Sequence, residues 1–132
     1  MTLSRPVACL ALLLSLAACG ERQAAVVAPV AVKTAPHSSY VGRWAVSLAG
    51  CQAGAWEFAK DRLSTAGEVA CTFAKVAPTP AGYTVQAECA AQGPQTPQTF
   101  TLTFAGVGAA ETMTVAGGPW SGPVALVRCP VG

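Results

Sequence analysis

The residues best able to react or to bind a metal in this chain of 132 residues are six cysteines and one histidine. Thiols act as nucleophiles, metal ligands and redox centres, and pairs of them form disulfides. The sequence contains no Cys-x-x-Cys and no Cys/His spacing typical of a zinc site. The cysteines after residue 50 therefore predict structural disulfides and no metal site. These are Cys51, Cys71, Cys89 and Cys129.

Candidates for catalysis are few. A Ser or Cys nucleophile usually needs a His or Lys base. The histidine, His37, precedes the part of the chain expected to fold, and the only lysines of that part are Lys60 and Lys75. The acidic residues are expected to be isolated on exposed strand faces; they are Glu57, Asp61, Glu68, Glu88 and Glu111. We therefore predict no catalytic residue and no cofactor. Two carboxylates brought together by the fold are the enzymatic alternative.

The charge pattern argues against nucleic acid as a partner. The formal net charge is only +2, and Lys and Arg form no cluster. Binding to a phosphate backbone depends on such clusters. Since 11% of the residues are charged, Thr, Gln, Ser and Gly must cover much of the surface.

The N-terminus has the organisation of an export signal. Arg5 supplies a positive charge, and an apolar run over 7–16, too short to span a bilayer, leads to small residues before Cys19. A general secretory signal peptide is one interpretation, in which Cys19 is simply a cysteine near the cleavage site.

The segment Leu16-Ala17-Ala18-Cys19 resembles the lipobox of bacterial lipoproteins. The resemblance implies that residues 1–18 are removed and that Cys19 carries a diacylglycerol on its sulfur. In Gram-negative bacteria it also implies a fatty acid such as palmitate on the Cys19 amine, and two or three acyl chains anchor a protein stably. Gly20, in place of Asp, implies the outer membrane, with the folded part in the periplasm or at the cell surface.

After the leader, residues 19–39 predict a lipidated cysteine and a flexible linker. This segment is rich in Ala, Val and Pro and has no periodicity. Pro29 and Pro36 favour extended backbone over helix. A short strand at 25–27 is the alternative.

Residues 40–132 predict one small all-β domain. Apolar residues recur at every second position in runs that Gly and Pro separate. The runs cover 44–48, 56–58, 69–73, 83–89, 100–104, 112–115 and 124–128. About seven short strands of this kind indicate an antiparallel meander closed as a barrel or packed as a sandwich. A helix over Trp56–Leu63 is the alternative to the second strand, and the following Ser-Thr-Ala-Gly indicates a turn.

The hairpin register selects a disulfide pairing. With Cys9 lost and Cys19 lipidated, four cysteines allow three pairings. If the chain turns at about 78–82, Cys71 lies opposite Cys89 and Phe73 opposite Ala87. The other pair, Cys51–Cys129, then joins the end of the first strand to the last, as in a barrel.

The segment Gly42-Arg43-Trp44 resembles the opening motif of lipocalins and other calycin barrels. The resemblance implies that Trp44 plugs the closed end of the barrel and stacks against Arg128 on the last strand by a cation–π contact. Small bacterial metalloprotease inhibitors and periplasmic lysozyme inhibitors are similar and fit the length better. Trp44 is a core residue in one interpretation and a ligand contact in the other.

Trp120 lies in a loop of Gly and Pro over 117–123, where it is either a binding anchor or a cap on the barrel mouth. The sequence thus predicts an envelope lipoprotein whose domain binds or inhibits another envelope macromolecule. A calycin-type binder of a small apolar ligand is the alternative. A barrel of seven or eight short strands is about filled by its own side chains, which favours surface recognition.

Overall fold

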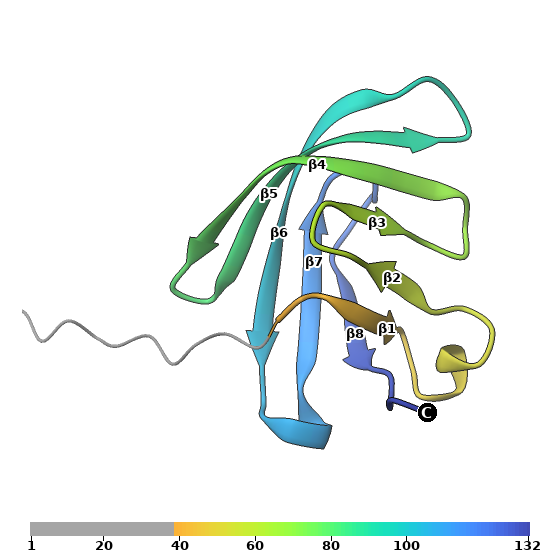
Figure 1. Ribbon diagram of the computed structural model, residues 1–132, viewed down its shortest axis with the longest axis vertical. Coiled ribbons are helices and arrows are strands. Elements are labelled where there is room, and N and C mark those ends of the chain that lie inside the picture. The colour runs from red at the N-terminus through yellow and green to blue at the C-terminus, as the bar shows by residue number, and fades with distance from the viewer. Residues whose placement is uncertain (1–38) are drawn as a thin grey trace, which may run out of the picture. The chain divides into compact units, whose positions relative to one another are not determined.

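In the computed structural model, residues 39–132 are described, and they form a closed antiparallel barrel of eight strands (Figure 1). Every strand pairs with the next one in sequence, and the last pairs back with the first. The strands are β1 (Gly42–Ala45), β2 (Trp56–Phe58), β3 (Arg62–Ser64), β4 (Val69–Thr79), β5 (Gly82–Ala91), β6 (Thr96–Ala105), β7 (Thr112–Gly117) and β8 (Val124–Arg128). The predicted all-β meander is confirmed. The predicted leader, Cys19, the linker up to residue 38 and His37 lie outside the described residues.

Two local predictions about the first strands need correction. The predicted strand over 56–58 is present as β2, but the alternative helix over 56–63 is wrong, because β2 and the unpredicted strand β3 form a hairpin with a tight turn between Phe58 and Arg62. The first strand stops at Ala45, so Val46 and Leu48 do not continue its buried face and are 63% and 65% exposed. After β1 the chain turns into the 3-10 helix η1 (Ala49–Cys51) instead.

The pairing of β4 with β5 has the predicted register near the disulfide. Cys71 lies opposite Cys89, and Phe73 lies opposite Ala87. Beyond Phe73 the register shifts, leaving Ala74 as an extra residue of β4 in the manner of a β-bulge. The strand then continues through Pro78, so the turn is shorter than predicted.

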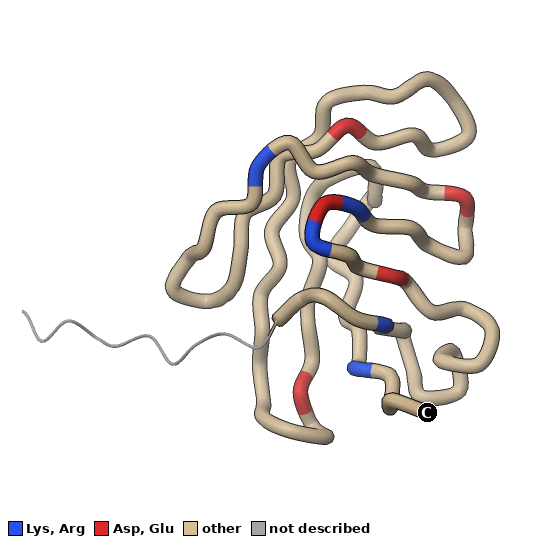
Figure 2. The backbone as a smooth tube through the Cα atoms, viewed as in Figure 1, with Lys and Arg blue, Asp and Glu red and all other residues tan. Residues whose placement is uncertain are grey.

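The inner face of the barrel forms the core, while the Thr-rich faces of β6 and β7 are turned outwards. The largest fully buried side chains are Trp44, Phe100, Leu63, Leu102, Met113, Leu126, Val85 and Val115. Charged residues are sparse and scattered along the chain (Figure 2). A second 3-10 helix, η2 (Gly108–Ala110), lies between β6 and β7. Residues 39–132 contain no helix with the length and apolarity that a membrane crossing requires.

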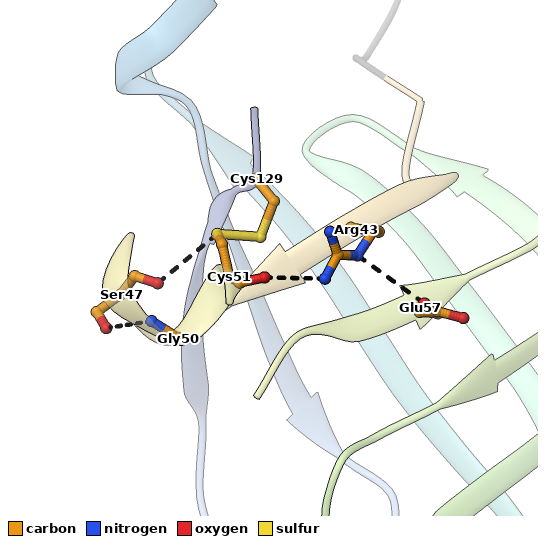
Figure 3. Close-up of a disulfide and its surroundings, with 6 residues drawn as sticks. All are labelled: Arg43, Ser47, Gly50, Cys51, Glu57 and Cys129. Carbon is orange, nitrogen blue, oxygen red and sulfur yellow. Dashed lines mark hydrogen bonds and ion pairs between the residues drawn. A yellow bond between two sulfur atoms is a disulfide. The ribbon is translucent and has the colours of Figure 1, made fainter. Parts of the chain in front are cut away.

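Both predicted disulfides are present. Cys71–Cys89 joins β4 to β5, with Cα atoms 4.1 Å apart, and Cys51–Cys129 joins η1 to the residue after β8, with Cα atoms 5.5 Å apart. Figure 3 shows the second bond and the Arg43 side chain, which donates a hydrogen bond of 2.8 Å to the Cys51 carbonyl oxygen. The bond holds the β1–β2 loop against the end of β8.

Candidate functional site

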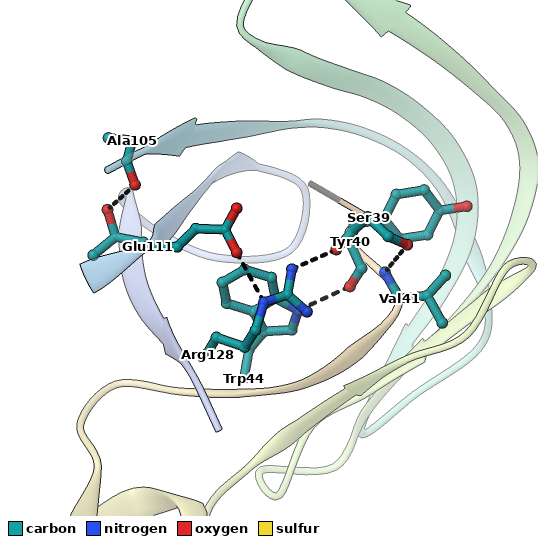
Figure 4. A network of polar contacts seen from close by, with 8 residues as sticks. Ser39, Tyr40, Val41, Trp44, Ala105, Glu111 and Arg128 are labelled. Atoms are coloured by element: carbon teal, nitrogen blue, oxygen red, sulfur yellow. Dashed lines mark hydrogen bonds and ion pairs between the residues drawn. The ribbon is translucent and has the colours of Figure 1, made fainter. Parts of the chain in front are cut away.

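The candidate site is a polar cluster where β8 meets β1, with Trp44 and Glu111 buried and the Arg128 side chain 32% exposed. Trp44 and Arg128 are direct partners across these two strands, and the Arg128 guanidinium carbon lies 4.1 Å from the centre of the Trp44 ring (Figure 4). This is the cation–π contact that the calycin resemblance implies. Trp44 has no exposed surface, so its ring belongs to the core and not to an open binding surface.

Glu111 completes the cluster and corrects a sequence prediction. It was expected on an exposed face, but it is only 5% exposed and accepts a hydrogen bond of 2.8 Å from Arg128 Nε. The reason is visible in the alternation of the strand, because position 111 has the same parity as the inward-facing Met113 and Val115. A carboxylate buried in this way needs a cationic partner, and Arg128 supplies it.

The segment before β1 crosses the cluster and supplies its remaining acceptors. Arg128 Nη2 donates to the Ser39 carbonyl oxygen at 2.7 Å, and Trp44 Nε1 donates to the Tyr40 carbonyl oxygen at 2.8 Å. Among the described residues, every buried side-chain nitrogen or oxygen has a hydrogen-bond partner. The cluster is therefore fully satisfied, and its groups are committed to holding the barrel end together.

Tyr40 anchors this entering segment to the barrel wall. Its hydroxyl donates to the Lys60 carbonyl oxygen at 2.8 Å, and its ring packs edge-on against Phe73 and Tyr83. Burial raises the pKa of the Tyr40 hydroxyl above its ordinary value, and the neighbouring Tyr83 and Asp61 raise it further. The neutral phenol is thus the form that the fold favours.

Gly42 makes room for the arginine. Its φ is +139°, and a Cβ atom there would lie 3.3 Å from Arg128 Nη1. A larger residue would be strained in its backbone and would press against the guanidinium. The glycine of the Gly-x-Trp motif is thereby explained by the close approach of Arg128.

Trp120 packs against a different part of the barrel interior. Its ring stacks on Trp56 with centroids 5.0 Å apart and meets Phe100 edge-on at 5.6 Å. It is half-buried, as a cap on the apolar interior would be. This geometry favours the cap over the free binding anchor, while a role of Trp120 in binding stays a prediction.

The outer surface carries shallow hollows and separated charges. One hollow of about 280 Å³ crosses β4, β5 and β6, and another of about 300 Å³ lies over β1, β2 and β3. Glu57, on β2, forms an exposed ion pair with Arg43 at 3.9 Å. Within residues 39–132, no three His, Cys, Asp or Glu side chains are grouped as a metal site requires.

The fold and the cluster define a class: a small closed eight-stranded β-barrel, fastened by two disulfides and by an Arg–Glu pair over a core tryptophan. In comparisons with known proteins, the chain matches no family model, no curated protein and no solved structure.

Proposed function

We propose that this protein is a lipoprotein of the bacterial outer membrane whose small barrel recognises another envelope macromolecule with its outer surface. The observation that carries the surface-recognition part is the filled interior. Trp44 and Met113 have no exposed surface, and Phe100 is 1% exposed, so the space that would hold a small ligand contains the protein's own side chains. Binding must then use the outside of the barrel, in the manner of an inhibitor or adaptor.

The two disulfides support the exported location. Disulfides persist in oxidising compartments such as the periplasm and the cell surface, and they are rare in the cytosol. Four cysteines of the described residues are all paired, which leaves Cys19 available for lipid in the mature chain.

The alternative of a calycin-type binder, with a pocket lined by Trp44, Trp56 and Phe100, is less well supported, because Trp44 is fully buried and the other two pack against Trp120. Trp56 stacks on Trp120, and Phe100 meets the edge of the same ring. Opening a pocket would require this aromatic cap to separate from the core.

The anchor is tested with a pair of cysteine variants. Cys19→Ala should abolish labelling by radioactive palmitate and release the folded protein from membranes. The matched control Cys9→Ala, in the leader, should keep both the label and the membrane association. Membrane-bound, labelled Cys19→Ala protein after a high-salt wash would refute the lipidation site.

Surface recognition is tested by photo-crosslinking in cells. A photoreactive residue at Gln86, in the β4–β6 hollow, or at Arg43, in the β1–β3 hollow, should give a discrete adduct from one face only. Native mass spectrometry of the purified barrel should find no retained fatty acid. Stoichiometric fatty acid in the protein, with no adduct from either face, would favour the apolar-ligand alternative.

A further inference from the structure

Four of the five large apolar side chains that are exposed in residues 39–132 gather at one end of the barrel, and the fifth, Val41, lies just before β1. Val46, Leu48, Val107 and Val131 are 63%, 65%, 83% and 99% exposed. They belong to three segments, the β1–β2 loop, the β6–β7 loop and the last four residues, which lie together at the lower end in Figure 1. A groove of about 420 Å³ joins these segments and is lined by Leu48, Ala109, Pro130 and Val131. We call these three segments the apolar end.

The three segments of the apolar end contain no charged side chain. Residues 46–55, 105–110 and 129–132 include no Lys, Arg, Asp or Glu. At its border, Arg128 and Glu111 neutralise each other through a contact of 2.8 Å. Figure 2 shows the other charged residues along the barrel wall and in other loops. One of them, Arg43 on β1, donates a hydrogen bond of 2.8 Å to the Cys51 carbonyl oxygen at the edge of this end. The exposed aliphatic side chains at this end therefore have few charged groups around them, and a contiguous exposed apolar patch marks a contact surface.

The composition of the apolar end favours lipid over a protein partner. Protein interfaces draw their affinity from central Trp, Tyr and Arg anchors in fitted pockets. Here the projecting side chains are small aliphatic ones on loops of Gly and Ala, and none of the three segments contains an aromatic residue. Separate Val and Leu side chains need no shape complementarity to insert into a lipid bilayer, because the lipids are fluid and rearrange around them.

The chain also enters the barrel beside this end. Ser39 is bonded through its carbonyl oxygen to Arg128, and Arg128 lines the apolar groove. Residues 20–38 connect this point to Cys19. A linker of about 19 residues spans roughly 60 Å at most, so a lipid on Cys19 would keep the barrel close to the bilayer at a high effective concentration.

We propose that the apolar end rests on the lipid bilayer, with Leu48, Val107 and Val131 in the boundary between headgroups and acyl chains. The inference rests on the proposed lipid anchor and adds an orientation to it. The β5–β6 turn, at the opposite end of the barrel in Figure 1, then points away from the membrane and towards a partner.

The test measures contact with brominated phosphatidylcholine, which quenches tryptophan that enters the bilayer. Val107→Trp places a fluorophore at the apolar end, and Gln95→Trp is the matched control in the β5–β6 turn. The lipidated full chain is reconstituted in phosphatidylcholine vesicles with and without bromine, and the wild-type signal is subtracted. We expect the added fluorescence to fall by about half or more at position 107 and to stay nearly constant at position 95, since surface-bound apolar groups enter by about 5–10 Å.

A second preparation separates this inference from the lipidation itself. Residues 20–132 with an N-terminal hexahistidine tag are held on nickel-chelating lipids, so that the barrel is tethered whether or not Cys19 is naturally acylated. Quenching at position 107 in this preparation supports the orientation even if Cys19 carries no lipid. Equal, weak quenching at both positions on tethered protein overturns it. A photoreactive residue at position 107 that crosslinks to a protein and not to lipid also overturns it, in favour of a protein partner.

Discussion

Arg128 and Trp44 close the barrel as direct partners across β8 and β1, with the guanidinium carbon 4.1 Å from the centre of the indole ring. The two strands share only two partner positions, so their backbone ladder is short. The arginine compensates by binding three groups from separate parts of the chain: the Trp44 ring, the Glu111 carboxylate and the Ser39 carbonyl. The Arg128 side chain thereby stabilises the β1–β8 pairing that closes the barrel, which its few backbone hydrogen bonds alone would leave weak.

Replacing Arg128 by Lys should therefore destabilise the protein although the charge is kept. The planar guanidinium donates hydrogen bonds to Glu111 and Ser39 while its face stacks on the Trp44 ring, and the ammonium group of Lys cannot make all three contacts. We expect a loss of about 2 kcal/mol in the free energy of unfolding, because the Glu111 carboxylate is buried and loses its aligned donor. Arg43→Lys is the control, since Arg43 is exposed and should cost less than about 0.5 kcal/mol. Urea unfolding measures both, and equal costs would contradict the role of Arg128.

The coupling between Arg128 and Glu111 is measurable in a double-mutant cycle. Arg128→Met leaves the buried Glu111 carboxylate without its cation, and Glu111→Gln leaves the partly exposed Arg128 without its anion. The costs of the two single substitutions should therefore add up to more than the cost of the double variant. We expect a coupling energy of about 1–3 kcal/mol. Additive effects of the two substitutions would show that the 2.8 Å contact contributes nothing specific.

Removing the cap should open the apolar interior. Trp120→Ala deletes the ring that stacks on Trp56 and contacts Phe100. Since the side chain is half-buried, we expect a loss of about 2 kcal/mol, less than for a fully buried tryptophan. Increased fluorescence of a hydrophobic dye is the second readout. If stability and dye binding match the wild type, the cap interpretation fails and Trp120 regains the role of a surface anchor.

The two disulfides should contribute unequally. In the chain-entropy model, Cys51–Cys129 spans 78 residues and stabilises by about 4.5 kcal/mol, while Cys71–Cys89 spans 18 residues and stabilises by about 3 kcal/mol. Replacing both cysteines of one pair by Ala in turn tests the order by thermal unfolding. A greater loss from the Cys71/Cys89 pair would show that the β4–β5 hairpin depends on its bond more than loop length predicts.

Gly82 is required because the backbone of a neighbouring strand approaches it closely. A Cβ atom at Gly82 would overlap the Leu102 carbonyl oxygen of β6, so Gly82→Ala should cost at least about 2 kcal/mol through a forced shift of the strand. Gly93 has no atom within 4 Å of the same position, and Gly93→Ala should be nearly neutral. Chemical denaturation of the two variants distinguishes a steric requirement from a general preference for glycine.

The raised pKa of Tyr40 predicts a pH dependence at the alkaline side. Its ordinary value is 10.0, and the folded protein holds the proton to higher pH than the unfolded chain does. The stabilisation is therefore fully present below pH 10 and declines as pH rises from there through the folded pKa. The difference in unfolding free energy between wild type and Tyr40→Phe should be constant up to this point and then fall. A difference that stays constant at higher pH would contradict the assignment.

Much of the fold could be predicted because period-two alternation and turn residues carry it. The cysteine pairing followed from the register that places Cys71 opposite Cys89, a purely geometric consequence of the hairpin. The short strand β3 was missed because Arg62, Leu63 and Ser64 contain one apolar residue, too few for a period to be recognised. Val46 and Leu48 misled the prediction because alternation does not distinguish a strand from an exposed loop with the same spacing.

The polar cluster was harder to predict. Arg128 was identified only through its resemblance to a family motif, and Glu111 was assigned to the surface because carboxylates are usually there. Both side chains follow the inward parity of their strands, alongside Leu126 and Met113. A charged residue of each sign on inward positions of two adjacent strands was thus a signal for a buried pair. The contribution of Ser39 could not be predicted, since a backbone carbonyl has no sequence signature.

The Cys51–Cys129 bond also makes the chain between these residues a covalent ring that contains every strand from β2 to β8. A protease that cuts one loop of this ring produces no free fragment, because the two new ends stay attached through the sulfur atoms. All strands of the cleaved barrel stay covalently joined, so they can pair again. At the proposed location in the envelope, where proteases are present, the barrel would thus tolerate a first cleavage, and only a second cut would release a piece of the sheet.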